Sequence, residues 1–351
     1  MKHRVVLIGF GAVGQGLAEI LQARMAALQA HSGVTFVVVA VSDLLKGSVY
    51  QPEGLDPGLL LDLARRGERL DAYPDGPGVI KGWDSLTTIR NSQADTVVEV
   101  SWTDVKTGQP AISHVKAAFA SGKHAVLTNK GPIALAFNEL QEAADAAGCL
   151  LRFEGTVMSG TPSIRLGRQA LAGCQISEIK GILNGTTNYI LTNMEAGTSY
   201  ADALAAAQRL GYAEADPTAD VEGFDALAKV VILANVLLGA HINLTDAPRQ
   251  GITGLSQADI AAAAAAGERW KLIGRVVRQA DGAVAASVQP LRLPVSHPLA
   301  GVSGVTNAIT FTTDLLGDVT LVGPGAGRQE TGFAVLSDLL EIALHSRSAS
   351  R

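Results

Sequence analysis

The stretch from Gly211 to Asn235, GYAEADPTADVEGFDALAKVVILAN, places five carboxylates and a lysine immediately before an apolar run. Within it, Asp225 and Lys229 are four residues apart, which puts them on one face of a helix. Such a pair is usually a solvated surface pair that contributes a few tenths of a kcal/mol. At the edge of a buried face, however, the same pair costs several kcal/mol in desolvation unless it finds partners. These residues alone leave two interpretations open, a solvated surface pair and a buried pair with a chemical role.

A glycine-rich motif near the N-terminus predicts nucleotide binding. The apolar strand pattern Arg4–Ile8 runs directly into a G-x-G-x-x-G sequence that opens a helical pattern. Such glycines permit a tight turn and let the backbone approach a pyrophosphate, while the helix N-terminus offers N–H groups to the phosphates. The alternative is a purely structural glycine turn. The cofactor contacts that the motif itself predicts are Gly9, Gly11 and Gly14.

Asp43, at the end of the second strand pattern, bears on the choice of cofactor. An acidic residue at this point usually holds the adenosine ribose diol and repels a 2′-phosphate, which favours NAD. No arginine stands beside it, although Lys46 is close enough in sequence to reach a phosphate. The alternative is that Asp43 is only a turn residue at the end of its strand. The cofactor prediction is therefore NAD or NADP, with a preference for NAD.

The composition describes a globular protein without a polyanionic partner. Of the 351 residues, 47% are hydrophobic and 17% are charged, and the net charge is −5 with no basic block. This balance argues against a nucleic-acid partner, and the longest apolar stretch is too short to cross a bilayer. Cys149 and Cys174 form no zinc or redox spacing, so we expect a reducing, cytoplasmic location. Four histidines without metal-binding spacing are expected to be structural: His114, His124, His241 and His297.

Short apolar strand patterns alternate with helical patterns through the first half of the chain. This alternation predicts an α/β fold with a Rossmann-type doubly wound parallel sheet, covered by helices on both faces. Residues 44–80, rich in Gly, Pro and Asp, suggest a loop excursion with one short helix. The strand patterns are 4–8, 35–42, 95–101, 124–128 and 149–154, and the helical patterns are 12–29, 109–121 and 132–147.

The pattern changes after Glu154 and predicts a second domain of the α+β class. The final strand, glycine turn and helix are expected to return to the first domain. We thus predict a dinucleotide-binding domain of residues 1–150, completed by 319–351, and a second domain of residues 151–318. Its helical patterns are 161–172, 187–196, 199–210, 222–238 and 261–266, and its strand patterns are 178–183, 272–279, 283–293 and 305–313.

Six motifs, taken together and in this order, resemble homoserine dehydrogenase over nearly the whole chain. They are the glycine loop, TNKGPIA (128–134), EGTVMSGTPSI (154–164), GILNGTTNYIL (181–191), the acidic stretch 211–235 and GAGRQETGFAVLSDLL (325–340). That family interconverts L-homoserine and L-aspartate 4-semialdehyde with NAD(P), on the route to threonine, methionine and isoleucine. The activity is what the resemblance implies, because the residues alone indicate only a nucleotide-dependent enzyme.

The resemblance implies catalytic and substrate-binding roles. The family's catalytic lysine corresponds to Lys229, its substrate aspartate to Asp225, and the lysine of its N-K motif to Lys130. Homoserine carries an ammonium, a carboxylate and the hydroxyl to be oxidised, so carboxylates suit the ammonium while lysines suit the hydroxyl and its developing alkoxide. Burial would favour the neutral, basic form of Lys229, whereas Asp225 would favour the charged form. The other implied substrate contacts are Glu214, Asp220, Gly185, Thr186 and Tyr212.

The resemblance also implies further cofactor contacts and a monovalent cation. The cofactor contacts that the resemblance implies are Phe10, Ala12 and Val13 in the glycine loop, and Ser101, Lys130, Gly211 and Gly327 outside it. A structural sodium site, or one that takes potassium, is implied at Glu154, Val157, Ser159 and Thr161, where carboxylate and carbonyl oxygens suit a hard cation. The alternative for Glu154 is a strand-end carboxylate bonded to nearby amides. Three residues are instead expected to form a helix cap and turn: Asn184, Thr187 and Asn188.

The resemblance further implies a homodimer, or a tetramer made of two dimers, formed through the second domain. The segments 272–279 and 283–293 are the expected surface. Because the chain stops soon after the last helical motif, we expect no C-terminal regulatory ACT domain and no threonine feedback through one.

Two alternatives belong to other functional classes. Another NAD(P)-dependent dehydrogenase of a small amino or hydroxy acid is the first, and aspartate-semialdehyde dehydrogenase in particular would need a cysteine nucleophile with an adjacent base. A non-catalytic NAD(P)-binding sensor is the second, and a DNA-binding version would need a basic recognition element. The sequence contains neither feature.

Overall fold

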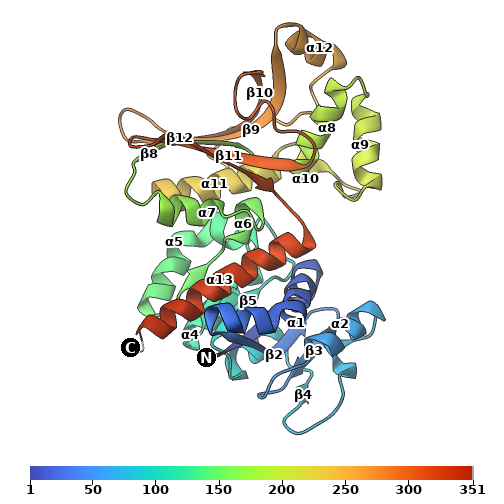
Figure 1. Ribbon diagram of the computed structural model, residues 1–351, viewed down its shortest axis with the longest axis vertical. Helices are drawn as coiled ribbons and strands as arrows, with labels where there is room; N and C mark the ends of the chain where they lie inside the picture. Colours follow the sequence, from blue (N-terminus) through green and yellow to red (C-terminus); the bar gives the residue numbers. More distant parts are fainter. Residues whose placement is uncertain (350–351) are drawn as a thin grey trace. The chain divides into compact units, whose positions relative to one another are not determined.

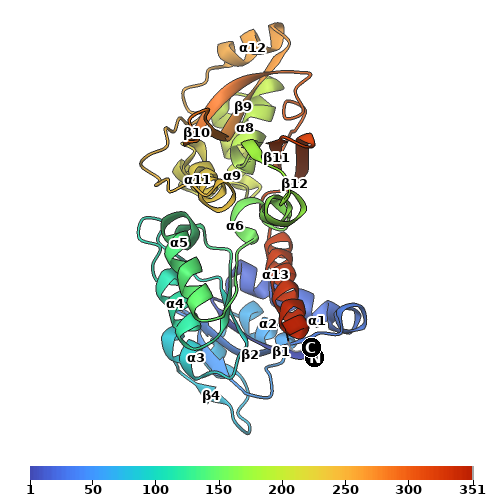
Figure 2. The ribbon, with the colours of Figure 1, turned by 90° about the vertical axis from the view of Figure 1, so that its left-hand side faces the viewer.

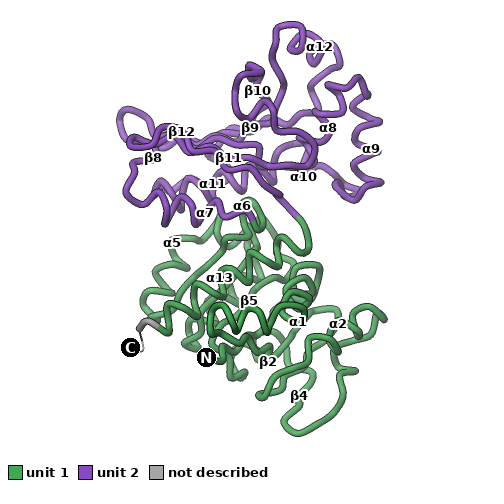
Figure 3. Tube along the Cα trace, viewed as in Figure 1, with its two compact units in different colours: residues 1–160, 327–351 green, residues 161–326 purple. Residues whose placement is uncertain are grey.

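The computed structural model describes residues 1–349 and divides into two compact units (Figure 3). Unit 1 comprises Met1–Gly160 together with the chain from Gly327 onward, and unit 2 comprises Thr161–Ala326. Each unit has a β-sheet of its own. The sequence prediction placed the domain boundaries a little earlier, after residue 150 and before residue 319.

Unit 1 is built on a seven-stranded sheet in the order β4-β3-β2-β1-β5-β6-β7. Strands β2, β1, β5, β6 and β7 are parallel, and β1 pairs with both β2 and β5. The chain leaves β1 toward one edge and later resumes beside it at β5, so the strand order reverses next to β1, as in doubly wound folds. The strand bounds are β1 Lys2–Ile8, β2 Thr35–Asp43, β3 Gly47–Tyr50, β4 Ile80–Lys81, β5 Thr96–Glu99, β6 His124–Leu127 and β7 Leu151–Arg152.

Helices cover both faces of this sheet, as Figure 2 shows with α3, α4 and α5 on one side and α1, α2 and α13 on the other. Successive side chains of β1 point to opposite faces of the sheet and pack in the two cores on either side of it. Val5 and Leu7 pack in one core with Leu17 of α1, whereas Val6 and Ile8 pack in another core with Ile89 of α3. The helix bounds are α1 Ala12–Ser32, α2 Pro57–Arg65, α3 Ser85–Asn91, α4 Ala111–Ala120, α5 Lys130–Ala146, α6 Gly155–Met158 and α13 Arg328–Ala349, with a 3-10 turn at Leu70–Ala72.

The segment 44–80 is more structured than the loop excursion that we predicted. Strand β3 pairs antiparallel with β2 and β4 pairs antiparallel with β3, so the segment extends the sheet at one edge. Helix α2 begins after Asp56, whose carboxylate accepts hydrogen bonds from the amides of Gly58 and Leu59. The buried leucines Leu60 and Leu61 of α2 belong to the same core as β1. The prediction of a single short helix was right for α2, but it missed the two strands, which are too short to show a periodic pattern.

Unit 2 contains a five-stranded antiparallel sheet in the order β10-β9-β8-β11-β12. Helix α11 runs along this sheet (Figure 1) and approaches it closely at Gly274, where a methyl group would lie 2.6 Å from Val230. The bounds are β8 Ile176–Ile182, β9 Glu268–Arg278, β10 Val284–Pro294, β11 Thr306–Thr313, β12 Gly317–Pro324, α7 Ser163–Arg165, α8 Gly185–Glu195, α9 Tyr200–Arg209, α10 Thr218–Val221, α11 Phe224–Leu238 and α12 Gln257–Ala265, with a π turn at Leu166–Ala170.

These two sheets confirm the predicted α/β fold class, with one sheet of mainly parallel strands and one antiparallel sheet. One assignment at the C-terminal end was wrong. We expected the last strand to return to the first domain, but β12 pairs with β11 in unit 2, and only helix α13 belongs to unit 1. The expected helix 161–172 is also broken, because α7 is followed by a π turn. Across residues 1–349, no helix is long and apolar enough to span a membrane.

The burial of α2 predicts a large difference between two adjacent leucines. Leu60 is 0% exposed, whereas Leu59 is 41% exposed on the same helix. Truncation of a buried leucine to alanine leaves a cavity and typically costs about 2–5 kcal/mol. We expect Leu60→Ala to lose stability in this range and Leu59→Ala to change it by about 0.5 kcal/mol. Urea unfolding measures the stability loss of each variant. A loss for Leu60→Ala as small as that expected for Leu59→Ala would mean that Leu60 does not lie in the core.

Candidate active site

The glycine loop between β1 and α1 contains two glycines that the fold itself requires. Gly9 has a φ of +98°, and a methyl group there would lie 2.6 Å from the amide nitrogen of Ser101. A methyl group on Gly14 would lie 2.6 Å from the carbonyl oxygen of Gly9. Both positions are therefore limited to glycine, because side chains of L-residues meet backbone there. The loop is packed tightly against the end of β5.

Gly11 differs, because nothing within the protein requires glycine there. Its φ is −80°, and a methyl group would meet no atom within 4 Å. Gly11 is the N-cap of α1 and has no side chain to bond the amides of the first turn, which includes Ala12 and Val13. Open space above a bare helix N-terminus is the arrangement that binds a pyrophosphate. The residues present thus fit a dinucleotide, and Phe10 is fully buried beneath them.

Asp43 holds the neighbouring loop in place. Its Oδ2 accepts a 2.8 Å hydrogen bond from the amide of Phe10, and its Oδ1 accepts bonds from the amides of Leu45 and Lys46. Burial would raise the pKa of Asp43, but these amides and the Lys46 ammonium hold it below its ordinary value. Asp43 therefore acts as a charged turn residue at the end of β2, as in the structural alternative.

The other residues that we predicted for the cofactor lie in different places. Ser101 follows β5 and both its amide and its hydroxyl donate to Glu99. Lys130 is the first residue of α5, and Gly327, with a φ of +139°, precedes α13. These residues belong to unit 1, whereas Gly211 is exposed in unit 2 with a φ of +75°.

The charged pair of the acidic stretch is buried in unit 2. Lys229 is 6% exposed, and its Nζ donates a 2.7 Å hydrogen bond to Asp225 Oδ2 and a 2.6 Å bond to the carbonyl oxygen of Leu183. Both side chains lie in the first half of α11, and Leu183 follows β8. The ammonium thus meets a charged acceptor and a neutral one, and these bonds compensate much of the cost of burying it.

Asn184 joins this pair to a second carboxylate. Its side-chain amide donates to Asp225 Oδ2 at 3.0 Å and to Asp220 Oδ1 at 2.7 Å. Its side-chain oxygen accepts a hydrogen bond from the amide of Thr187, so Asn184 is also the N-cap of α8. The predicted helix cap is confirmed at Asn184, but we missed its second role. Its neighbour Asn188 lies inside α8 rather than in a turn.

Two carboxylates at this site face the same amide group. Burial raises the pKa of Asp220, and the nearby charge of Asp225 raises it further, while hydrogen bonds from Asn184 and Thr186 and the charge of Lys229 oppose this. Holding two carboxylates so close disfavours the ionised form of at least one of them. A cation placed between them would relieve this cost, so the arrangement suits the ammonium group of an amino acid.

Lys229, Asp225, Asn184 and Asp220 form one bonded group, which we call the Lys229 cluster. The other predicted substrate residues differ in their relation to it. Thr186 donates a 2.6 Å hydrogen bond to the carbonyl oxygen of Tyr212, whose ring contacts Tyr189 edge to face. A methyl group on Gly185 would lie 2.7 Å from the carbonyl oxygen of Val305, so backbone packs closely there. Glu214 is exposed on the loop before α10 and is not bonded to the Lys229 cluster.

The residues implied for a cation have the chemistry for one. Glu154 is 4% exposed, Val157 is fully buried, and Ser159 is the one described non-glycine residue with a positive φ, +52°. The backbone amide of Glu154 donates to Asp338 Oδ2, while Ser159 Oγ lies 2.8 Å from Thr331 Oγ1. Thr161 belongs to unit 2, where its hydroxyl donates to the carbonyl oxygen of Pro324.

Glu154, a buried carboxylate at the start of the short helix α6, and the backbone carbonyls of the residues that follow it are oxygen donors of the kind that a hard cation prefers. Among the described residues, no group of three His, Cys, Asp or Glu side chains is arranged to hold a metal. A monovalent cation held by one carboxylate and several carbonyls does not require such a group.

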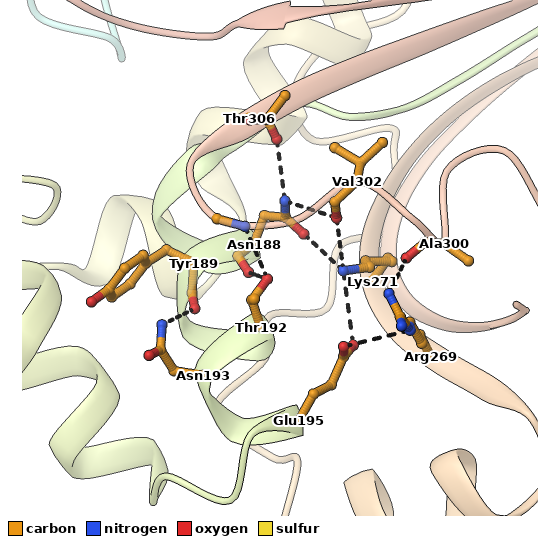
Figure 4. Close-up of polar contacts among 11 residues, drawn as sticks. Asn188, Tyr189, Thr192, Asn193, Glu195, Arg269, Lys271, Ala300, Val302 and Thr306 are labelled. Atoms are coloured by element: carbon orange, nitrogen blue, oxygen red, sulfur yellow. Dashed lines mark hydrogen bonds and ion pairs between the residues drawn. The ribbon is translucent and has the colours of Figure 1, made fainter.

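Another buried lysine of unit 2, Lys271 on β9, was not anticipated (Figure 4). It is 0% exposed; its Nζ donates to the carbonyl oxygen of Val302 at 2.9 Å and to Asn188 Oδ1 at 3.2 Å, and lies 3.8 Å from Glu195. Burial lowers the pKa of Lys271, and the Glu195 carboxylate opposes that shift. Asn188 lies on α8, and Val302 lies in the loop before β11. Lys271 therefore links β9 to both α8 and that loop.

Cys149 does not supply the nucleophile that a semialdehyde dehydrogenase would need. Cys149 is buried, and burial raises the pKa of its thiol, which disfavours the reactive thiolate. Its sulfur lies near the carbonyl oxygen of Ala147 rather than near a base. The chemistry of the described site therefore rests on lysines and carboxylates.

Comparison with known proteins places this site in a family. Residues 162–340 match the family model for homoserine dehydrogenase, and residues 9–154 match the model for the homoserine dehydrogenase NAD binding domain. A protein of Pseudomonas canavaninivorans described as an NAD(+)-dependent homoserine dehydrogenase is 47% identical, over 97% of this chain and 96% of its own. A homoserine dehydrogenase of Methanocaldococcus jannaschii is 40% identical, over 96% of this chain and 98% of its own.

Solved structures agree with the sequence matches. The crystal structure of a homoserine dehydrogenase from Thiobacillus denitrificans superposes with a TM-score of 0.84 at 32% identity, covering 99% of this chain and 74% of that one. A hyperthermophilic archaeal homoserine dehydrogenase in complex with NADPH has a TM-score of 0.82 at 30% identity, with 98% of each chain covered. The expected resemblance is confirmed, and the chain belongs to the homoserine dehydrogenase family of NAD(P)-dependent oxidoreductases.

Proposed function

We propose that Lys229 is the proton-transfer group of the homoserine dehydrogenase reaction in this protein and that Lys130 polarises the reacting oxygen. In the direction of oxidation, C4 of L-homoserine gives a hydride to the nicotinamide while its hydroxyl gives a proton to the neutral amine of Lys229. The C4–O bond becomes the carbonyl of L-aspartate 4-semialdehyde. A base held against the hydroxyl and a cation at the developing alkoxide are what this step needs.

The Lys229 cluster is the single observation that supports this proposal. A lysine that is 6% exposed and that sits between a carboxylate and a backbone carbonyl serves stability poorly. The adjacent carboxylates Asp220 and Asp225 suit the substrate ammonium, and we retain Glu214, Gly185, Thr186 and Tyr212 as proposed neighbours of the substrate. Lys130 is proposed from its position in the N-K motif at the start of α5.

The proposal predicts that Lys229→Ala removes turnover. Loss of the general base should lower kcat by at least about 100-fold, because general acid–base catalysis typically contributes this much. Binding of NADH should change little, since the cofactor loop lies in unit 1. Steady-state kinetics with L-homoserine and a fluorescence titration with NADH measure the two effects.

The matched control for this experiment is Lys271→Met, which removes another buried lysine of unit 2. That change should lower thermal stability, because Asn188 and Val302 lose a donor, while the properly folded fraction keeps measurable turnover. If Lys229→Ala retained a kcat close to that of the parent protein, Lys229 could not be the base.

The proposed cofactor preference is NAD. Its physical support is Asp43, a carboxylate whose pKa is held low and which bonds the amide of Phe10 inside the cofactor loop. A fixed negative charge at the end of β2 would repel a 2′-phosphate. The relative from Pseudomonas canavaninivorans carries NAD(+) dependence in its name, whereas the archaeal relative is described in complex with NADPH.

The charge of Asp43 can be tested separately from its shape. Asp43→Asn removes the negative charge and keeps one acceptor oxygen, which can accept from the amide of Phe10 or from that of Leu45 but not from both. We expect the ratio of kcat/KM for NAD to that for NADP to fall about tenfold, which corresponds to about 1.4 kcal/mol of lost discrimination. An unchanged ratio would assign Asp43 to the turn alone and remove the basis for the NAD preference.

A structural sodium or potassium ion is proposed at Glu154, with the carbonyl oxygens of Val157, Ser159 and Thr161. We expect NaCl or KCl to raise the melting temperature relative to choline chloride at equal ionic strength, because a cation that binds only the folded state stabilises it. Glu154→Gln should abolish this difference while keeping the backbone bond to Asp338. The same response in both proteins would show that the effect is non-specific.

The remaining proposals concern organisation. Unit 1 is proposed to bind the dinucleotide and unit 2 the substrate, with dimer formation, or pairing of dimers into a tetramer, through the sheet segments 272–279 and 283–293. Strand β10 is the last strand at one end of that sheet, and an edge strand is a surface on which two sheets can associate. At Val288 this edge is already bonded to Pro248 and Gln250, so a second sheet would pair beside that point. Light scattering of the purified protein gives the oligomeric state directly. A cytoplasmic location is proposed from the two free cysteines.

A further inference from the structure

Glu99 is a fully buried carboxylate that none of the roles above uses. It is the last residue of β5 and is 0% exposed. Its Oε1 accepts hydrogen bonds from the amide of Ser101 at 2.8 Å, from the hydroxyl of Ser101 at 2.5 Å and from the side-chain amide of Asn129 at 3.1 Å. A buried carboxylate that gathers three donors on one oxygen is costly to retain for packing alone.

One arm of this network reaches the cofactor loop. Gly9, the first glycine of the loop, approaches Val100 and Ser101 so closely that a methyl group on it would lie 2.6 Å from both the carbonyl oxygen of Val100 and the amide nitrogen of Ser101. The position of Ser101 thus limits the position of the loop. Because Glu99 holds Ser101 by two hydrogen bonds, it sets one wall of the dinucleotide site.

The second arm reaches the residue before Lys130. Asn129 is the N-cap of α5, where an asparagine side chain normally bonds the amides of the first turn. Here it makes no such capping bond and donates to Glu99 instead. The side chain that would have stabilised the helix start is used to connect the ends of two neighbouring parallel strands, β5 and β6.

The other carboxylate oxygen of Glu99 is also occupied. His114 Nδ1 on α4 lies 2.5 Å from Oε2, and its ring is 6% exposed. The carboxylate is therefore held from both sides, by a helix beneath the sheet and by the two loops at its edge. It cannot turn toward a ligand without breaking these bonds, so its action on the reaction must be indirect.

We propose that Glu99 is a positioning residue that couples the cofactor loop, through Ser101, to the start of α5, through Asn129. This inference rests on the proposed role of Lys130, the residue that follows Asn129. In this arrangement one carboxylate fixes both the dinucleotide wall and the backbone that carries the polarising lysine. A purely structural role would instead affect only the stability of unit 1.

The test is a double-mutant cycle on Glu99 and Asn129 in the full-length protein. Glu99→Gln keeps the size of the side chain but offers one oxygen in place of two and adds donors. We expect it to lower kcat about tenfold and to weaken NADH binding several-fold, since hydrogen bonds to charged groups contribute this much. Asn129→Ala should lower kcat about tenfold with nearly unchanged NADH binding.

The kcat of the double variant should be no lower than that of the less active single variant, because both changes break the same connection. A kcat that fell by the product of the two single effects would overturn the proposal. So would a Glu99→Gln variant with parental kcat and NADH affinity but a lower melting temperature.

The matched control is Thr96→Val, at the opposite end of the same strand. Thr96 Oγ1 lies 2.8 Å from His3 Nε2 in a buried contact, so its loss should lower the melting temperature without changing kcat or NADH binding. If Glu99→Gln does not fold, Ser101→Ala and Asn129→Ala carry the test, with weaker NADH binding expected for the first and lower kcat for the second. Parental values in both would overturn the proposal.

Lys130→Met separates this inference from the function on which it rests. A parental kcat in Lys130→Met would refute the role proposed for Lys130 and, with it, the expected loss of kcat through Asn129. The effect of Glu99→Gln on NADH affinity would still be measured independently, because that arm passes through Ser101 and not through Lys130.

Discussion

The burial of the Lys229 ammonium is the constraint on which the arrangement of unit 2 depends. A lysine can be 6% exposed only if acceptors meet it, and here Asp225 comes from its own helix while Leu183 comes from the end of β8. Asn184, the next residue, bonds Asp225 and begins α8. The first turns of α11, the end of β8 and the start of α8 are therefore held together by these bonds. The contacts that compensate the buried charge of Lys229 are the same contacts that assemble the site.

Sequence reasoning succeeded where structure and chemistry are both local. The glycine loop follows β1 and opens α1 within a few residues, so its strand, turn and helix are visible in one short window. The i, i+4 pair of Asp225 and Lys229 is local in the same sense. The partners of Asn184 are not, because Asp220 and Asp225 lie 36 and 41 residues away along the chain. A local pattern predicts the helix cap at Asn184 but gives no information about these tertiary bonds.

Most of the features that were missed depend on contacts that are not local. Strands β3 and β4 are four and two residues long, too short for an alternating pattern; β3 is held by pairing with β2, and β4 by pairing with β3. β12 is different, because only residues 314–316 separate it from its partner β11, and that short connection is a local hairpin signal that the prediction did not use. Glu99 and Lys271 appear in the sequence as charged interruptions of apolar strands, and only the surrounding donors and acceptors show why they are tolerated.

The two acceptors around Lys229 also bear on how a buried lysine can act as a base. A lysine ammonium has three hydrogens, and the neutral amine keeps two of them together with one lone pair. Leu183 and Asp225 require two donors, at 2.6 and 2.7 Å, so both remain bonded when the amine loses its third proton. Neither acceptor then becomes a buried polar group without a partner, which would cost about 1–3 kcal/mol. The hydrogen bonds to Leu183 and Asp225 are thus compatible with the proton-transfer role proposed for Lys229.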